Sequence, residues 1–289
     1  MRSVVLEADD VWFTYPDGTQ ALKGVSFKVF EGETVVLLGP SGAGKSTVLL
    51  HFAGILFPSS GSVYVCGEKV SRRNVKEVRR HVGLVFQNPE SQLFCPTVWD
   101  DVAFGPTSMG LPANEVERRV KRALEAVGIL ECAWKHPHHL SFGEKRRAAL
   151  ATVLSMSPDV YLFDEPTANL DPRNAFFVIE KIAELSGEGK TVLVATHDVD
   201  VLPQVASRVI IMSGGRVFSD GEPEKVLSDF KLIAEAGLRP PVITSFLHSL
   251  NEEGILNVDE PYSISQQKAK QKVKESIEKL LKPYLMKQT

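Results

Sequence analysis

The segment "GPSGAGKS" at residues 39–46 constrains the fold of this chain more than any other. It fits the pattern G-x-x-x-x-G-K-[ST], follows the apolar run "ETVVLL", and leads into a helical pattern that continues to about Gly54. The apolar run predicts a buried strand, so the segment is expected to turn from that strand into a helix. Glycines let backbone N–H groups turn inward around phosphates, and the helix N-terminus adds the positive end of its dipole.

This turn is therefore expected to bind the phosphates of a nucleotide. We expect Lys45 to reach the β- and γ-phosphates, and the hydroxyl of Ser46 to ligate Mg²⁺. The residues expected to contact ATP here are Gly39, Pro40, Ser41, Gly42, Ala43, Gly44, Lys45, Ser46 and Thr47.

Charged residues follow two other apolar runs that predict buried strands. "VYLFDE" ends in Asp164 and Glu165, and "KTVLVATHD" carries His197 near its end. Ligand-binding groups of α/β sheets gather outside the carboxyl ends of the strands. We expect Asp164 to hold Mg²⁺ and Glu165 to activate the attacking water. A single histidine is more often structural, but this position suits His197 as a sensor of the γ-phosphate.

A third motif, "LSFGE" at residues 140–144, predicts the start of a helix. Ser141 and Glu144 are spaced as a capping box, and an apolar-periodic run continues behind them. Gly143 opens the first turn, and an exposed helix start of this kind is suited to hold an anion.

The remaining pattern outlines the organisation of the chain. Short strands flank a "PDGT" turn in about the first 35 residues, and residues 75–157 read as helical with polar loops. "RVIIM" and "RVFSDG" predict closing strands, and helices follow Glu224. A tail at residues 265–287 is amphipathic, and we expect it to pack on its own domain or on a partner subunit rather than on a membrane or nucleic acid. The residues on its apolar face are Ala269, Val273, Ile277, Leu280, Leu281 and Tyr284.

Composition excludes several classes of protein. The 289 residues are 43% apolar and 24% charged, as in an ordinary globular protein, and the net charge of −3 does not indicate a nucleic-acid partner. The three widely spaced cysteines (Cys66, Cys95 and Cys132) argue against a disulfide framework or a zinc site. No signal peptide is evident, and no apolar run approaches the roughly 18–20 residues that span a bilayer. We therefore expect a cytoplasmic protein that does not itself cross a membrane.

In their order along the chain, "GPSGAGKST", "LSFGE", "VYLFDEPTANLD" and "THD" make residues 3–225 resemble an ATP-binding-cassette (ABC) ATPase. The resemblance implies an α/β fold of the P-loop NTPase type, with a RecA-like mixed sheet, an antiparallel β subdomain and a helical subdomain at about 88–157. Residues 1–225 would form the nucleotide-binding domain. Residues 226–289 would form a small, mainly helical appendage that docks on its own domain or on a second subunit.

The resemblance also assigns roles to residues that the local patterns leave open. Tyr15 in "WFTYPDG" would stack on adenine. Gln87 in "VGLVFQNPE" would end a strand, report to a membrane partner, and count among the catalytic residues with Lys45, Glu165 and His197. It would also join Ser46 and Asp164 as a Mg²⁺ ligand. Asp171 in "ANLD" would lie in a loop that crosses to the opposing subunit.

In this family "LSFGE" takes the place of the signature motif, usually LSGGQ. The signature residues would be Ser141, Phe142, Gly143 and Glu144. Two subunits would pack head to tail, so that Ser141 and Gly143 contact the γ-phosphate held by the P-loop of the partner. Phe142 replaces a glycine and Glu144 a glutamine, which we interpret as marks of a subfamily rather than of inactivity. Whether the pair is a homodimer or a heterodimer stays open.

Two longer segments, "FQNPESQLFCPTVWDDVAFGP" and "GEPEKVLSDFKLIAEAGLRPP", resemble the energy-coupling-factor (ECF) importers of cobalt, nickel or vitamins. Phe142 and "KRRAALATVLSM" favour the cobalt and nickel branch, and a vitamin remains the alternative cargo. The resemblance implies Mg²⁺-dependent ATP hydrolysis at the cytoplasmic face of a membrane. Its expected partners are a second ATPase subunit, a transmembrane coupling protein and a substrate-binding membrane subunit.

Two other classes fit less well. A soluble ABC protein of DNA repair would carry a long coiled coil between Lys45 and Ser141, and a translation factor usually carries two cassettes. A regulatory cassette without hydrolysis would be expected to lose Glu165 or His197. The "HPHH" histidines (His136, His138 and His139) lack carboxylate or cysteine partners in sequence and are expected to be structural.

Overall fold

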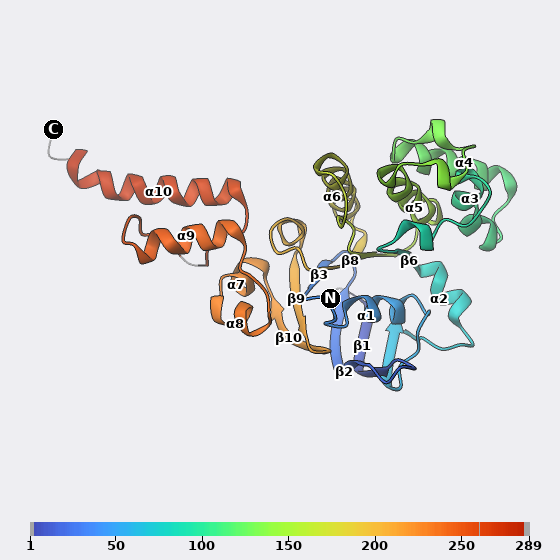
Figure 1. Ribbon diagram of the computed structural model, residues 1–289, viewed down its shortest axis with the longest axis horizontal. Coiled ribbons are helices and arrows are strands. Elements are labelled where there is room, and N and C mark those ends of the chain that lie inside the picture. Colours follow the sequence, from blue (N-terminus) through green and yellow to red (C-terminus); the bar gives the residue numbers. More distant parts are fainter. Residues whose placement is uncertain (1–2, 260, 286–289) are drawn as a thin grey trace.

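Two β-sheets share the centre of the computed structural model, which describes residues 3–259 and 261–285 (Figure 1). In this part of the chain a six-stranded sheet has the order β10-β9-β3-β8-β7-β6. All its neighbouring strands run parallel except β9 and β10, which are antiparallel. Its strands are β3 (Thr34–Leu38), β6 (Val82–Val85), β7 (Val160–Asp164), β8 (Thr191–Thr196), β9 (Arg208–Ser213) and β10 (Arg216–Gly221).

A smaller antiparallel sheet has the order β2-β1-β4-β5. Its strands are β1 (Val4–Thr14), β2 (Gln20–Phe30), β4 (Ser60–Val65) and β5 (Glu68–Lys69). Helix α1 (Lys45–Phe52) buries Val48, Leu49 and Phe52 in the hydrophobic cluster that joins the two sheets. The predicted α/β fold with a mixed sheet and an antiparallel β subdomain is confirmed.

Three helices form a separate group beside β6: α3 (Val98–Ser108), α4 (Ala113–Ala126) and α5 (Phe142–Met156) (Figure 1). Short 3-10 turns accompany them at Pro89–Ser91, Leu130–Cys132 and Pro137–His139. The helical pattern expected from about residue 75 is correct for α2 (Val75–His81) but wrong for β6. The run "VGLV" is too short to reveal a strand by its periodicity.

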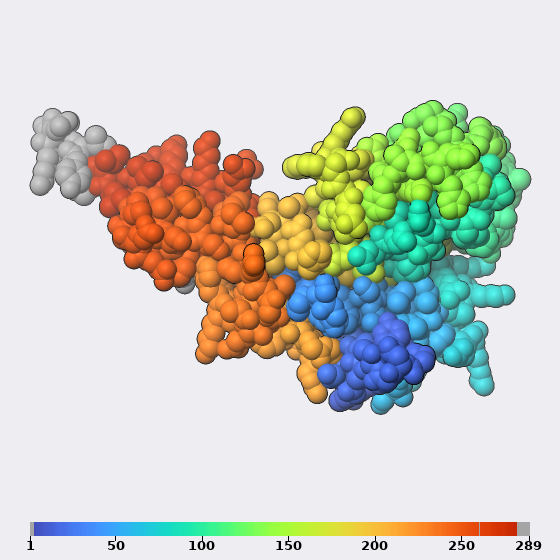
Figure 2. Space-filling view, viewed as in Figure 1, coloured from blue at the N-terminus to red at the C-terminus, as the bar shows by residue number. Residues whose placement is uncertain are grey.

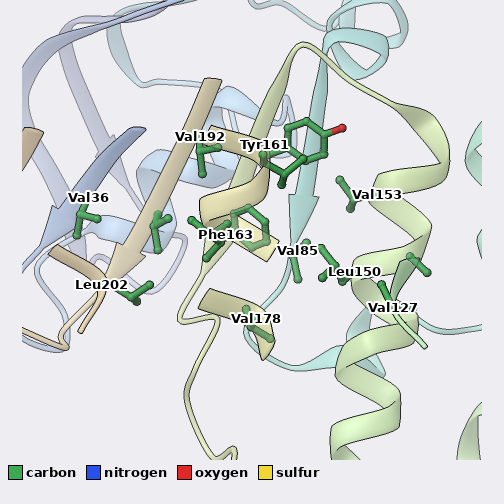
Figure 3. Packing of buried hydrophobic residues seen from close by; sticks show 14 of the residues in the cluster. Val36, Val85, Val127, Leu150, Val153, Tyr161, Phe163, Val178, Val192 and Leu202 are labelled. Carbon is green, nitrogen blue, oxygen red and sulfur yellow. The ribbon is translucent and has the colours of Figure 1, made fainter. Parts of the chain in front are cut away.

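Side chains from the large sheet and from α5 pack in one continuous cluster (Figure 3). Tyr161 and Phe163 of β7 lie toward Leu150 and Val153 of α5, and Val178 of α6 (Pro172–Gly187) closes the same region. This packing fixes the helical group against the strand that carries Asp164.

The C-terminal helices project from the β9–β10 end of the molecule (Figures 1 and 2). They are α7 (Pro223–Leu227), α8 (Phe230–Glu235), α9 (Val242–Glu252) and α10 (Gln266–Leu285). Val226 and Leu227 of α7 and Ile233 of α8 belong to the large hydrophobic cluster. Helices α9 and α10 enclose a small core around Leu247, Val258, Tyr262 and Ala269. Two polar contacts join α9 and α10 to the structure that precedes them. The N–H of Val242 donates to Asp200 (2.7 Å), and Lys268 pairs with Glu224 of α7 (3.1 Å).

Only part of the apolar face predicted for the tail is buried. Ala269 is buried in the small core and Val273 packs against it, whereas Ile277, Leu280 and Leu281 are 41–50% exposed. The side chain of Tyr284 lies outside the described residues. Among the helices of the described chain, none has the length and apolarity that crossing a bilayer requires.

Burial of the central strands predicts a large effect of truncation there. Leu162 in β7 is fully buried, so Leu162→Ala should lower the free energy of unfolding by roughly 2–5 kcal/mol through lost transfer energy and a residual cavity. Leu280→Ala, at a half-exposed leucine, is the control and should change it by no more than about 0.5 kcal/mol. Urea denaturation of both variants checks this, and equal effects would contradict the packing described for β7.

Candidate nucleotide-binding site

The P-loop connects β3, all of whose residues are buried, to α1. Gly44 caps α1 with φ +98°, a left-handed conformation that side chains rarely adopt. A Cβ at this position would also lie 2.7 Å from the carbonyl oxygen of Ala21. The sequence pattern therefore has a local cause, because only glycine allows the loop to turn directly into the helix.

Lys45, the first residue of α1, has its ammonium group folded back over the loop. Its Nζ donates to the carbonyl oxygens of Gly39 (2.8 Å) and Pro40 (3.0 Å) and lies 3.8 Å from Glu165 Oε1. Burial lowers the pKa of Lys45, and the negative charges of Glu165 and Asp164 oppose that change. The cation is thus placed between the loop and the carboxylates that follow β7.

Ser46 and Asp164 bring two oxygen atoms together beside the loop. Asp164 is the last residue of β7, and its Oδ1 accepts a hydrogen bond of 2.7 Å from Ser46 Oγ. Burial raises the pKa of Asp164, while the hydrogen bond from Ser46 and the charge of Lys45 work in the opposite direction. The carboxylate is therefore short of compensating positive charge.

Glu165 is held by residues at the end of β8. Its backbone has φ +43°, and its N–H donates to the carbonyl oxygen of Ala195. Its carboxylate accepts a hydrogen bond from Thr196 Oγ1 (3.1 Å), and His197 Nδ1 lies 2.9 Å from each carboxylate oxygen. Glu165 is only 8% exposed, whereas the side chain of His197 is 61% exposed, so the histidine lies on the solvent side of the glutamate.

A cleft of about 330 Å³ opens over these groups. Tyr15 and Gln87 contribute to its wall, together with P-loop residues, Glu165 and His197. The hydroxyl of Tyr15 hydrogen-bonds with Thr47 Oγ1 (3.0 Å), and its ring meets Phe13 edge to face with centroids 4.9 Å apart. The structure thus brings Tyr15 and Gln87 to the same cleft as the residues predicted from local patterns.

The signature segment does not take part in this cleft. None of the described residues that line it comes from Ser141–Glu144, and Asp171 is absent from its wall as well. Helix α5 instead belongs to the group of helices beside β6 (Figure 1).

The predicted capping box of α5 is confirmed. Ser141 N–H donates to Glu144 Oε2 (2.8 Å), and Glu144 N–H donates to Ser141 Oγ (3.3 Å). The Ser141 hydroxyl also donates to Glu144, and these bonds keep the pKa of the glutamate below its usual value.

The loop that carries Asp171 lies against this helix start. Asp171 caps α6 by accepting from Asn174 N–H (2.9 Å), and a Cβ at Gly143 would lie within 2.6–3.1 Å of the Asn174 side chain. Asn174 is fixed further by a hydrogen bond from Arg147 Nη2 (3.0 Å). The two segments that the sequence linked to a partner subunit are therefore neighbours within one chain.

The histidine segment has a local structural role. His136 caps the turn Pro137–His139 by accepting from His138 N–H, and the rings of His136 and His138 stack with centroids 5.1 Å apart.

One buried residue close to the site was not predicted. Arg146, in the first turns of α5, is 1% exposed and donates to three carbonyl oxygens in two loops. It belongs to the run "EKRR", and charged residues near a helix start are normally solvated. Only its contacts across the fold reveal its location.

Comparison with known proteins places this geometry in a family. The sequence model described as "ABC transporter" matches residues 22–168, slightly more than half of the chain. The chain belongs to the ABC transporter family. A model for an AAA domain, described as a putative AbiEii toxin of a type IV toxin–antitoxin system, also matches residues 135–202. As a member of the first family, the protein is an ATP-binding ATPase with the cassette fold.

Relatives match this ABC ATPase over nearly its whole length. A putative ABC transporter ATP-binding protein of Methanothermobacter marburgensis is 48% identical, covering 94% of this chain and 99% of its own. The energy-coupling factor transporter ATP-binding protein EcfA of Methanocaldococcus jannaschii is 47% identical, covering 91% of this chain and 95% of its own. The predicted resemblance to ECF-type ATPases is therefore confirmed.

Solved structures agree with this placement. The cbiO1 protein of Clostridium perfringens, described as part of the ABC transporter complex cbiONQ, has a TM-score of 0.71 and 40% identity over 85% of this chain and 99% of its own. A dimeric ATP-binding cassette bound to ADP and phosphate has a TM-score of 0.69 and 30% identity over 75% of this chain and 98% of its own.

Proposed function

We propose that this ABC ATPase is the ATP-hydrolysing subunit of an ECF-type membrane importer. The observation that carries the proposal is that Lys45, Glu165 and His197 line one cleft at the carboxyl ends of β3, β7 and β8, with Asp164 hydrogen-bonded to Ser46 of its wall. Groups that bind phosphate, hold a cation and accept a proton are then within reach of one bound nucleotide.

Each residue of the cleft has its own role in the proposed hydrolysis of ATP. The loop Gly39–Thr47 surrounds the phosphates, and Lys45 neutralises charge on the β- and γ-phosphates. Glu165 accepts the proton of the attacking water, and His197, in hydrogen-bond contact with it, orients the carboxylate and faces the γ-phosphate. Tyr15, at the wall of the cleft, stacks on adenine.

The oxygens around Ser46 fit a Mg²⁺ ion. The ion prefers hard oxygen ligands, and Ser46 Oγ and Asp164 Oδ1 already lie 2.7 Å apart beside the P-loop. Burial has raised the pKa of Asp164, so a cation there would supply charge that the carboxylate lacks. Gln87, in the wall of the same cleft, offers a further oxygen. When bound, Mg²⁺ would neutralise charge on the phosphates of ATP.

A second ATPase subunit completes each site in this proposal. The signature segment does not line the cleft of its own chain, and a related cassette is dimeric when bound to ADP and phosphate. Ser141 and Gly143, with Phe142 and Glu144 beside them, would contact the γ-phosphate held by the partner, and Asp171 would cross the same interface. Either a homodimer or a heterodimer satisfies this arrangement.

Membrane subunits are the other proposed partners, which places the protein on the cytoplasmic face of a membrane. Relatives carry the name energy-coupling factor transporter ATP-binding protein. The rings of Phe94 and Phe104 meet edge to face and are 67% and 52% exposed. This exposed apolar pair suits contact with a transmembrane coupling protein, which would itself hold a substrate-binding membrane subunit.

For the cargo we propose cobalt or nickel ions. Phe142 and the run "KRRAALATVLSM" after it in α5 support this choice through their resemblance to the cobalt and nickel branch. A vitamin is the alternative.

Hydrolysis should depend on Glu165. Glu165→Gln keeps the shape of the side chain but removes the base, so MgATP turnover should fall roughly 10²–10⁴-fold. The variant should also accumulate an ATP-bound dimer, detectable by sedimentation, because the products that drive opening are not formed. Lys45→Ala, which loses phosphate contacts, is the control and should form no such dimer. Wild-type turnover of Glu165→Gln would refute the proposed role.

Mixing two inactive variants should restore activity if the sites are shared between subunits. Lys45→Ala removes a phosphate contact, and Ser141→Arg fills the signature seat with a bulky side chain. In a mixed dimer both lesions fall in one composite site, which leaves the other site intact. ATP hydrolysis should therefore recover in the mixture but in neither homodimer. No recovery, with subunit exchange and dimer formation confirmed, would argue against sharing of the site or against the sufficiency of one intact site.

Transport by the assembled complex tests the cargo. Vesicles that contain the membrane partners and this subunit should accumulate Co²⁺ or Ni²⁺ only with ATP supplied on the side of the ATPase. The same vesicles with Glu165→Gln are the control and should show no ATP-driven accumulation. Uptake of a vitamin without metal uptake would assign the protein to the vitamin branch.

A further inference from the structure

We propose that Arg146 is a positioning residue that couples the signature helix to the catalytic glutamate of its own chain. The inference rests on the proposed role of Glu165 and adds a second residue to it. Arg146 does not line the nucleotide cleft, so its effect would act through Glu165 rather than through contact with ATP.

The guanidinium group of Arg146 joins loops at the ends of two neighbouring strands. Nη1 donates to the carbonyl oxygen of Phe86, the residue after β6 and before Gln87 (2.7 Å). Nη2 donates to the carbonyl oxygen of Glu165, the residue after β7 (3.0 Å), and more weakly to that of Ala168 (3.5 Å). One side chain thus fixes the backbone on both sides of the β6–β7 edge.

The backbone of Glu165 needs such an anchor. Its φ of +43° is uncommon for a residue with a side chain, and such a conformation persists only where surrounding contacts hold it. The N–H is held by Ala195, and the carbonyl oxygen by Ala168 N–H (3.2 Å) and Arg146. The direction in which the Glu165 carboxylate points therefore depends in part on Arg146.

The guanidinium group of Arg146 is a buried charge whose hydrogen bonds are incomplete. Arg146 is 1% exposed, and its Nε finds no hydrogen-bond acceptor among the described residues. Burying a charge is costly unless it is paired, and here Asp164 and Glu165 supply the nearby opposite charge. The cost is offset by contacts to the catalytic loops, which a solvated side chain could not make.

Arg146 lies on the helix that begins with the signature residues, so it links them to the backbone of Glu165. Ser141 and Gly143, which face the partner's nucleotide in the proposed dimer, begin the same helix. A shift of this helix start would move the guanidinium group, and with it the backbone of Glu165. Arg146 therefore gives each composite site a route to the catalytic base of the other.

Steady-state kinetics of Arg146→Met tests the proposal. The change keeps an unbranched apolar side chain but removes every donor, so kcat for MgATP should fall about 10- to 100-fold, as expected for a mispositioned base. The KM for ATP should stay within about threefold, because the P-loop contacts are untouched. Arg119→Met is the matched control. Arg119 donates to the carbonyl oxygen of Met156 at the other end of α5, and its loss should leave kcat within about twofold.

A double variant separates positioning from general support of the fold. In the Glu165→Gln background, Arg146→Met should lower the residual rate by less than about twofold, because its effect acts through the lost base. Arg146→Lys, which keeps the charge with fewer donors, should recover part of the kcat. A wild-type kcat for Arg146→Met, or a full further loss in the Glu165→Gln background, would overturn the proposal.

Two further results are interpreted separately: misfolding of Arg146→Met, and wild-type turnover of Glu165→Gln. If Arg146→Met does not fold, as judged by circular dichroism and ATP binding, Arg146→Lys carries the test and should lose at least about threefold in kcat with unchanged ATP affinity. A wild-type kcat for that variant would again overturn the proposal. If Glu165→Gln itself keeps wild-type turnover, the proposed function of Glu165 fails and this inference fails with it.

Discussion

The parallel pairing of β7 with β8, and of β8 with β3, decides where the charged groups of the cleft lie. In this register Leu38 is opposite Thr196, and Asp164 is opposite Ala195, so the three strands end at one edge. Strands buried on both faces cannot hold charges without large desolvation costs. The charges therefore begin where the apolar strands end, and the fold brings them together although their segments are far apart in sequence.

The buried charges of the site lie close to charges of opposite sign, which offset part of the cost of burying them. Lys45, Arg146, Asp164 and Glu165 are each at most 9% exposed. Burial lowers the pKa of the lysine and of the arginine and raises that of Asp164, and in each case nearby opposite charges act against the effect of burial. Removing one of these residues would leave another uncompensated, so the four should respond to substitution as a unit rather than independently.

Local patterns predicted the parts of the site that depend on local physics. A P-loop needs glycines and a helix start, and a capping box needs two residues three positions apart, so both were evident from the sequence. The role of Arg146 was not, because its acceptors at Phe86 and Glu165 lie 60 and 19 positions away. For the same reason the sequence could not show that Ala269 packs while Leu280 stays exposed, since both fit one helical face. Family resemblance supplied Tyr15 and Gln87, and the structure brings both to the cleft wall.

Phe142, which stands where the family usually has a glycine, contacts the buried Arg146. The ring of Phe142 lies over the guanidinium group of Arg146, with 6.0 Å between the ring centroid and Cζ, at the outer limit of a cation–π contact. Glycine has no side chain and could not make this contact with the guanidinium group. Ser141 and Gly143, the residues proposed to contact phosphate, are unaffected by this exchange. The departure from the family pattern thus lies beside the buried arginine that hydrogen-bonds to the Glu165 backbone, and it leaves Ser141 and Gly143 as the family has them.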